Sequence, residues 1–390
     1  MKPIMKPIVK LITTALLTSY GCASTSQNQQ LDRLATGGIE PPSPGQPKEE
    51  MVVLDPVSDW KKMFIAPPDS KTKRIISSNL EQWPKPKEAK DFLKKARLEN
   101  ALGRKSYAES TLRSGIRNFP TDPDIKLELA LNLSEVGQHE NAFALLSEIR
   151  QDLDLTTYPD KIFVFKYRYC LGISYLERGD VMRGQEIMSQ LIGIDPTFSP
   201  AYVALGISYI KLGKLEAAEF VAKRALERAG QNPATMNLAG TIARRNGHLK
   251  ESIEWFSKSL INDQNHIPSL VNRASVHLES NDVDNALKDI EVAMKIDPDH
   301  IDALTVYSSI IIMKDNDESA ISILTKIIEI DQNNADARFN LALITERQKG
   351  AETDLRRLYQ EVVQLSPESS STHIRAKQRL SELKRWRPNL

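Results

Sequence analysis

A period of 34 residues runs through most of this chain and constrains its fold more than any other feature. Position eight of every repeat is small: Ala96, Ala130, Gly172, Gly206, Gly240, Ala274, Ser308 and Ala342. Position fifteen holds residues that tolerate turn conformations, namely Gly103, Gly137, Gly179, Gly213, Gly247, Asn281 and Asp315. Apolar runs of helical spacing flank each turn. This pattern predicts helix–turn–helix repeats that stack on one another.

Eight repeats fit between residues 89 and 368 if one insertion, Thr157–Val164, is placed after the second repeat. Their predicted bounds are 89–122, 123–156, 165–198, 199–232, 233–266, 267–300, 301–334 and 335–368. In the eighth repeat Lys349 stands at the turn position and Gly350 follows it. We therefore expect this turn to slip by one residue, because glycine adopts the turn conformation more readily than lysine.

The fourth repeat carries Tyr202, Leu205-Gly206, Tyr209, Ala218 and Ala225. At this spacing these residues resemble the signature of the tetratricopeptide repeat family. The resemblance implies an all-α fold, a right-handed α-solenoid of about eight 34-residue helix–turn–helix repeats closed by a C-terminal capping helix and tail in residues 369–390. Arg168 and Arg338 replace the large apolar residue that the family has at position four. We therefore expect the third and eighth repeats to pack less tightly.

The N-terminus has the layout of an export signal. Lys2, Lys6 and Lys10 precede a short apolar run, Leu11–Leu17, which is far shorter than the roughly 20 residues that span a bilayer. Gly21-Cys22 resembles the lipobox of bacterial lipoproteins. That resemblance implies that residues 1–21 are a lipoprotein signal peptide, that Cys22 is acylated, and that Ala23 directs the protein to the outer membrane, facing the periplasm. An ordinary secretory signal and retention at the inner membrane are the alternatives.

Residues 22–88 are rich in Pro, Ser and Gln and show no regular period, so we expect a flexible tether. One part of it, Met51–Pro67, concentrates apolar residues and includes Trp60 and Phe64. Two interpretations remain open: this segment caps the first repeats, or it is a short linear motif for a partner.

The composition gives no sign of catalysis. The chain has 52 basic and 51 acidic residues, so it lacks the basic field of a nucleic-acid-binding protein. Its six histidines are scattered, and no phosphate-binding loop or metal-ligand spacing occurs, so we expect no enzyme activity, no cofactor and no metal. Cys170 fits a small, partly buried apolar residue, with a redox or intermolecular thiol as the alternative. The basic cluster Lys90, Lys94, Lys95 and Arg97 is interpreted as a solvated face, with a phosphate or lipopolysaccharide site as the alternative.

In the tetratricopeptide family, positions two, five, nine and twelve of each repeat line a concave groove. The resemblance implies a groove that takes an extended peptide or a helix of a protein partner. The residues we expect to line it are Tyr169, Ile173, Val203, Ile207, Ile210, Asn237, Thr241, Arg244, Val271, Ser275 and Phe339. Packing of the apolar members against neighbouring repeats, with no external ligand, is the alternative.

These features together predict a protein–protein interaction scaffold anchored in the membrane through its N-terminal acyl chains. Its plan is similar to that of lipoproteins that assist the assembly of pili and secretion complexes. Two other functions stay open: an adaptor for cell-wall hydrolases or proteases, and an accessory of polysaccharide export. Fold alone does not decide among them.

Overall fold

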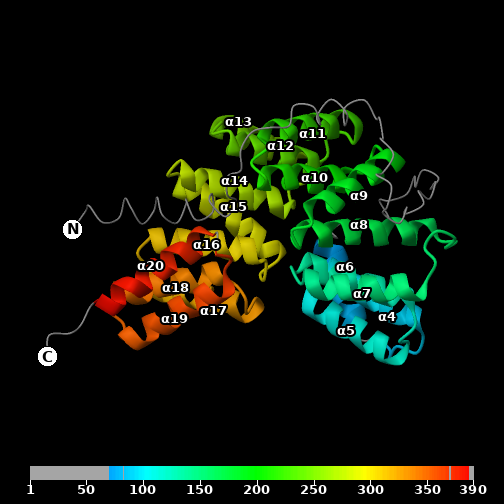
Figure 1. Cartoon of the computed structure of the whole chain (residues 1–390), viewed down its shortest axis with the longest axis horizontal. Coiled ribbons are helices and arrows are strands. Elements are labelled where there is room, and N and C mark those ends of the chain that lie inside the picture. The colour runs from blue at the N-terminus through cyan, green and yellow to red at the C-terminus, as the bar shows by residue number, and fades with distance from the viewer. Residues whose placement is uncertain (1–69, 82, 369, 386–390) are drawn as a thin grey trace, which may run out of the picture. The chain divides into compact units, whose positions relative to one another are not determined.

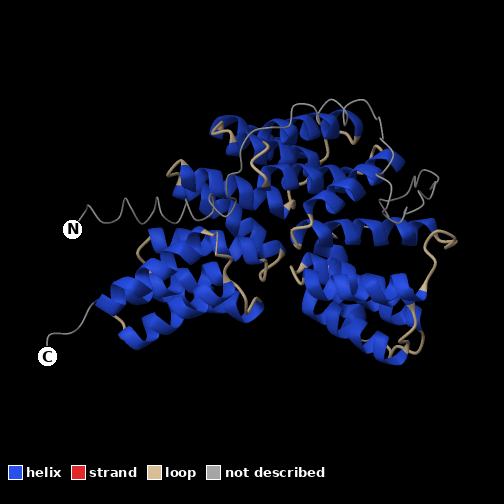
Figure 2. Cartoon of the chain, viewed as in Figure 1, coloured by secondary structure: helices blue, strands red, loops and turns tan. Residues whose placement is uncertain are grey.

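The computed structural model describes residues 70–81, 83–368 and 370–385, and all regular structure within these ranges is α-helical (Figure 2). This confirms the predicted all-α fold class. The predicted signal peptide, Cys22 and the segment Met51–Pro67 lie outside the described residues.

The described part of the chain forms one leading helix, eight helix pairs and one closing helix (Figure 1). The leading helix is α3 (Ser70–Glu81). The pairs are α4 (Ala89–Ala101) with α5 (Lys105–Asn118), α6 (Pro123–Glu135) with α7 (His139–Asp152), α8 (Lys161–Glu177) with α9 (Val181–Ile194), α10 (Ser199–Lys211) with α11 (Leu215–Arg228), α12 (Pro233–Arg245) with α13 (Leu249–Asn262), α14 (Ile267–Glu279) with α15 (Val283–Ile296), α16 (Ile301–Met313) with α17 (Asp317–Ile330), and α18 (Ala335–Arg347) with α19 (Glu352–Leu365). The closing helix is α20 (Ser371–Arg385).

Seven of the eight first helices begin at the first residue of a predicted repeat, and α8 is the exception. It begins at Lys161, inside the predicted insertion, because the carboxylate of Asp160 accepts hydrogen bonds from the amides of Ile162 and Phe163. These amides have no partner within the helix, so an aspartate at this place starts the helix about one turn early.

Contacts between Cα atoms divide the described residues into two compact units, and the boundary falls within α10, α11 and α12. The N-terminal unit holds the described residues up to 208 together with 216–235. The C-terminal unit holds 209–215 and the residues from 236 onward. Within the units, the first helices of successive pairs pack on one another, as α4 does on α6, α6 on α8, and α14 on α16. We call the surface that these helices present the first-helix face.

The helix ends follow a repeating chemistry. Aspartate at position thirty-one follows the second helix in four repeats, and its carboxylate accepts the backbone N–H two residues further on: Asp195 from Thr197, Asp263 from Asn265, Asp297 from Asp299, and Asp331 from Asn333. Such turns satisfy backbone donors where the chain leaves a helix. These carboxylates therefore serve the fold.

Position-eight glycines are packing residues. A Cβ atom on Gly240 of α12 would lie 2.6 Å from Cε1 of Phe256 on α13, and one on Gly172 of α8 would lie 2.5 Å from Cε of Met188 on α9. Real Cβ atoms do not approach other atoms this closely. The two helices of a pair are therefore in contact where the sequence places its small residue.

The expected loose packing at position four does not hold for the eighth repeat. Arg338 Nε donates to Oε2 of Glu361 on α19 at 3.1 Å; the Arg338 side chain is largely covered and that of Glu361 is half-buried. Lys126, at the same position of the second repeat, pairs with Glu148 and Asp152 on α7. A cation at position four is thus matched by an acid on the second helix of its own pair.

The last part of the predicted tether is helical, which corrects the expectation for residues 22–88. Helix α3 packs on α4, and Nη2 of Arg104 donates to Oγ of Ser77 at 2.9 Å. The physical reason is the four-residue spacing of Ile76 and Leu80, which places two half-buried apolar side chains on one side of a short helix.

Helix α20 covers α18 and α19, as the predicted capping helix should. Ala376 is fully buried, Thr372 Oγ1 donates to Asp336 at 2.6 Å, and the Arg375 guanidinium lies 4.6 Å from the ring centre of Phe339. These contacts cover the apolar side of the last pair with a helix whose other side is polar.

The eighth turn does not slip. Lys349 itself adopts φ = 56°, at the same position where earlier repeats have glycine, asparagine or aspartate. A residue with a Cβ atom in this left-handed conformation costs roughly 1–2 kcal/mol. We expect Lys349→Gly to raise the free energy of unfolding by about 1 kcal/mol, measured by urea denaturation.

The neighbouring glycine supplies the contrast for this prediction. A Cβ on Gly350 would lie 2.5 Å from Cγ2 of Thr345, so Gly350→Ala should destabilise the protein. A lower unfolding free energy for Lys349→Gly would show that the strain assigned to this turn is absent.

Candidate functional site

The predicted groove residues of the N-terminal unit lie on α8 and α10. Tyr169, Ile173 and Val203 are half-buried, and Ile207 is 39% exposed. Tyr169 and Ile173 are four residues apart, as are Val203 and Ile207, so each pair lies on one side of its helix. These four residues leave apolar surface open on the first-helix face.

Phe198, directly before α10, is a buried residue that packs against Tyr169 of this surface. Its ring centre lies 5.4 Å from that of Tyr169 and 4.8 Å from that of Phe165, both in edge-on geometry. Burial raises the pKa of the Tyr169 hydroxyl above its ordinary value. The α8 surface is therefore held by a rigid aromatic cluster.

Four of the predicted groove residues are buried: Ile210, Val271, Ser275 and Phe339. Phe339 is 3% exposed because Tyr359 of α19 and Arg375 of α20 cover its ring. Val271 belongs to a core cluster, and Ser275 Oγ donates to the Val271 carbonyl at 2.8 Å. Because these four side chains are buried, they offer a partner almost no surface. The predicted set of groove residues loses these four members.

The polar residues predicted on α12 are engaged with α14. Oδ1 of Asn237 accepts from Asn272 Nδ2 at 3.0 Å, and Thr241 Oγ1 donates to the Asn237 carbonyl at 2.8 Å. Nε and Nη2 of Arg244 donate to Oε1 of Glu279 at 2.9 and 2.5 Å. Glu279 therefore neutralises Arg244, and this predicted groove residue does not present an available cation.

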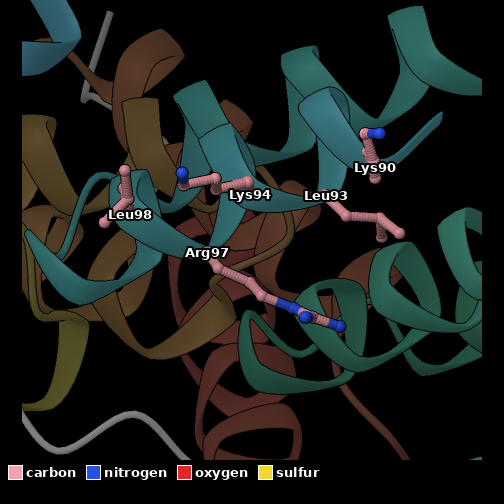
Figure 3. A pocket seen from close by; sticks show the side chains of 5 residues that line it. All are labelled: Lys90, Leu93, Lys94, Arg97 and Leu98. Atoms are coloured by element: carbon pink, nitrogen blue, oxygen red, sulfur yellow. The ribbon is translucent and has the colours of Figure 1, made fainter. Parts of the chain in front are cut away.

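The basic cluster that the sequence placed on a solvated face lies on α4, and sequence reasoning missed the pocket beside it. Lys90, Leu93, Lys94, Arg97 and Leu98 line a pocket of about 430 Å³, and all five come from this single helix (Figure 3). We call this set the α4 surface. The missed signal was in the repeat register: Lys90, Leu93 and Arg97 occupy positions two, five and nine of the first repeat, which are groove positions.

The charges of the α4 surface are only partly balanced. Arg97 Nη2 donates to Oε2 of Glu128 on α6 at 3.0 Å. Burial alone would lower the pKa of Arg97, but the hydrogen bond and charge of Glu128 outweigh it and raise the pKa. Lys90 pairs with Glu88 at 2.6 Å, and Lys94 Nζ lies 5.7 Å from the ring centre of Trp83.

Second helices of the N-terminal unit also carry exposed apolar residues. Tyr107, Met182 and Phe220 lie one per helix on α5, α9 and α11. Apolar residues scattered singly in this way are normal on a protein surface. They provide controls for the first-helix face.

The described residues contain no cluster of three or more His, Cys, Asp or Glu side chains that could hold a metal ion. In the same part of the chain, no helix has the length and apolar character of a membrane span.

Cys170 is a core residue, 1% exposed, with its Sγ 3.7 Å from Oγ of Ser134. Burial raises the pKa of its thiol to about 12. We expect Cys170 to resist alkylation by iodoacetamide in the folded protein at pH 8 and to react once urea unfolds it, as followed by mass spectrometry.

The same pKa shift predicts a dependence of stability on pH. The folded pKa lies above the unfolded one, so the thiol's contribution to the free energy of unfolding is complete below the unfolded pKa and is lost as pH rises toward 12.

In the alkylation experiment, rapid reaction of Cys170 in the native protein at pH 8 would contradict its placement in the core.

Comparison with known proteins supports the repeat assignment. Residues 203–267 match one sequence model of the tetratricopeptide repeat, and residues 267–300 match another. The TPR repeat-containing protein YpiA of Bacillus subtilis is 24% identical over 215 residues, which are 51% of this chain and 49% of YpiA. Anaphase-promoting complex subunit 3 of Schizosaccharomyces pombe is 24% identical over 203 residues, 52% of this chain and 29% of that protein. The chain spans about half or less of the length of these relatives.

Among solved structures, the human IFIT1 dimer with PPP-AAAA resembles this chain with a TM-score of 0.54 at 14% identity. The match covers 81% of this chain and 85% of that one. A likeness at such identity shows the fold alone. The chain carries tetratricopeptide repeats, whose general role is that of non-enzymatic scaffolds with protein partners in the groove.

Proposed function

We propose that this chain is a non-enzymatic scaffold that binds a protein partner on the first-helix face of α8 and α10. The observation that carries the proposal is the set of four apolar residues that keep open surface there, Tyr169, Ile173, Val203 and Ile207. Exposed apolar surface on a rigid repeat array is what an amphipathic helix or an extended segment of a partner would cover.

The chemistry of this surface favours an apolar anchor on the partner. Burial of apolar area contributes about 25 cal/mol per Å², and the aromatic cluster behind Tyr169 limits the side-chain entropy lost on binding. The polar residues on α12 already bond to α14, so they add little to recognition. The partner segment that fits α8 and α10 presents leucine, isoleucine or phenylalanine at helical or alternating spacing.

The proposal extends to location. The signal-like residues 1–21, the lipobox-like Cys22 and the Pro-rich segment support a scaffold held by acyl chains at the outer membrane and facing the periplasm. Within this class, assistance in assembling a pilus or a secretion complex is the role that the plan of the chain favours. This part rests on the sequence, since Cys22 lies outside the described residues.

In-cell photo-crosslinking tests the binding surface. A photoreactive residue at Val203 should trap a discrete protein, and the product should disappear when Ile207→Glu is added, because a carboxylate would be desolvated against the partner's apolar anchor. A product that persists at equal yield with Ile207→Glu would move the partner away from this surface.

Fractionation tests the anchor. Cys22→Ser should shift the protein from the membrane to the soluble fraction, whereas Cys170→Ala, the matched change at the other cysteine, should leave it at the membrane. Membrane retention of Cys22→Ser would argue against acylation and leave an ordinary secretory signal as the explanation.

A further inference from the structure

The α4 surface combines apolar and basic side chains. Leu93 and Leu98 are half-buried, and they line the same pocket as Lys90, Lys94 and Arg97. Such a surface combines burial of apolar area with attraction of carboxylates, so one peptide can use both.

The cations of this surface remain able to take a further carboxylate. The Lys90–Glu88 pair joins two highly exposed side chains, and exposed pairs of this kind contribute little, so Lys90 can exchange partners. Arg97 is 42% exposed and donates to Glu128 through Nη2, while the guanidinium has five N–H donors in all. The ammonium of Lys94 faces the Trp83 ring.

Nearby acids on α4 are occupied elsewhere. Oδ2 of Asp91 accepts the backbone amides of Lys87 and Glu88 and so caps the helix start, which holds the pKa of this carboxyl below its ordinary value. Glu99 is buried and pairs with Lys95 at 3.7 Å. The exposed charge on the α4 surface is therefore mostly positive.

The chain itself contains the complementary segment. Residues 49–60 read E-E-M-V-V-L-D-P-V-S-D-W, with four carboxylates, no basic residue and six large apolar side chains. Ten Cα–Cα steps separate Trp60 from Ser70, the start of α3. At about 3.3 Å per residue they reach roughly 33 Å, whereas the 13 residues of α4 extend about 20 Å.

Helix α3 follows residues 49–60 in the sequence and lies next to the α4 surface. It packs on α4, and its Ser77 bonds to Arg104 just beyond the end of α4. A connection of about ten residues gives an effective concentration on the order of millimolar, so even weak docking would be well populated.

We propose that residues 49–60 of the same chain occupy the α4 surface, with carboxylates against Lys90, Lys94 and Arg97 and apolar side chains against Leu93 and Leu98. This occupancy concerns the first repeat and is independent of the partner surface on α8 and α10.

Cross-linking in the full chain tests the occupant. A photoreactive residue at Leu98 should link to residues 49–60, as identified by mass spectrometry of the digested product. The same residue at Tyr107, which is exposed on α5, should not form this link. Mixing chains of natural and heavy isotope content separates a link within one chain from a link to a second copy. Mixed pairs, a link to another protein, or no link from Leu98 would each overturn the proposal.

Charge exchange provides the second test. Lys90→Glu with Lys94→Glu should lower the yield of the Leu98 link at least ten-fold, and adding Asp55→Lys with Asp59→Lys should restore most of it. Lys223→Glu, a change at an exposed lysine of α11 in the same unit, should leave the yield unchanged. If the yield of the Leu98 link falls and the aspartate changes do not restore it, charge pairing is not the basis of docking. Capture of a partner from Val203 should be unaffected by these changes, so failure here is distinguishable from failure of the proposed function.

Discussion

Replacing Arg273 with methionine is expected to lower the free energy of unfolding by about 3 kcal/mol. Arg273 on α14 forms a bidentate ion pair with Asp289 on α15, with distances of 2.8 Å from Nε to Oδ2 and 2.7 Å from Nη2 to Oδ1. Its Nη1 also donates to Oγ of Ser257 on α13 at 3.0 Å. One guanidinium thus joins three helices of two successive repeats.

The size of this effect comes from the acid left behind. The side chain of Asp289 is only 9% exposed, so removal of its partner strands a charge in a place that water hardly reaches. Urea denaturation of the full chain measures the change. Adding Asp289→Leu should recover much of the loss, because an apolar pair needs no neutralisation. Equal instability of the single and double variants would show that the ion pair is not the cause.

Alanine at Gly240 is the second change with a large expected effect. Its Cβ would lie 2.6 and 2.7 Å from two carbons of the Phe256 ring, which is fully buried and cannot swing away. Overpacking of this kind costs about 1–3 kcal/mol, more than the roughly 1 kcal/mol that alanine gains over glycine within a helix. We expect a net loss of about 1 kcal/mol or more and a looser contact between α12 and α13.

Gly193 provides the matched control. It also lies within a helix, α9, but a Cβ there would meet nothing within 4 Å. Gly193→Ala should therefore stabilise the protein by about 0.5 kcal/mol. The two alanine variants should shift the thermal midpoint in opposite directions, and shifts of the same sign would refute the packing role assigned to position eight.

The repeat register could be predicted closely from sequence because each unit repeats the same physical problem. A small residue is needed where two helices cross, and a turn former is needed between them, so Gly206 and Gly213 recur in equivalent form along the chain. Seven first helices begin where this register places them. The early start of α8 depends on one capping aspartate, Asp160, which a 34-residue period does not encode.

The candidate site was less predictable because burial depends on neighbours that the period does not specify. Position five is half-open at Tyr169 but covered at Phe339, since α20 adds Arg375 over that ring. Arg244 was predicted to line the groove, yet its guanidinium pairs with Glu279, which lies 35 residues away in the next repeat. Lys349 adopts a left-handed conformation although Gly350 stands beside it.

The most direct test of the central claim compares two residues of the same helix pair. Ile207 on α10 is 39% exposed and Phe220 on α11 is 41% exposed, so they differ mainly in the helix that carries them. The affinity of the purified full chain for the partner trapped at Val203 would be measured for Ile207→Glu and Phe220→Glu. We predict a loss of at least ten-fold for Ile207→Glu and a change within two-fold for Phe220→Glu. Equal effects, or a greater loss for Phe220→Glu, would contradict a partner surface on the first-helix face.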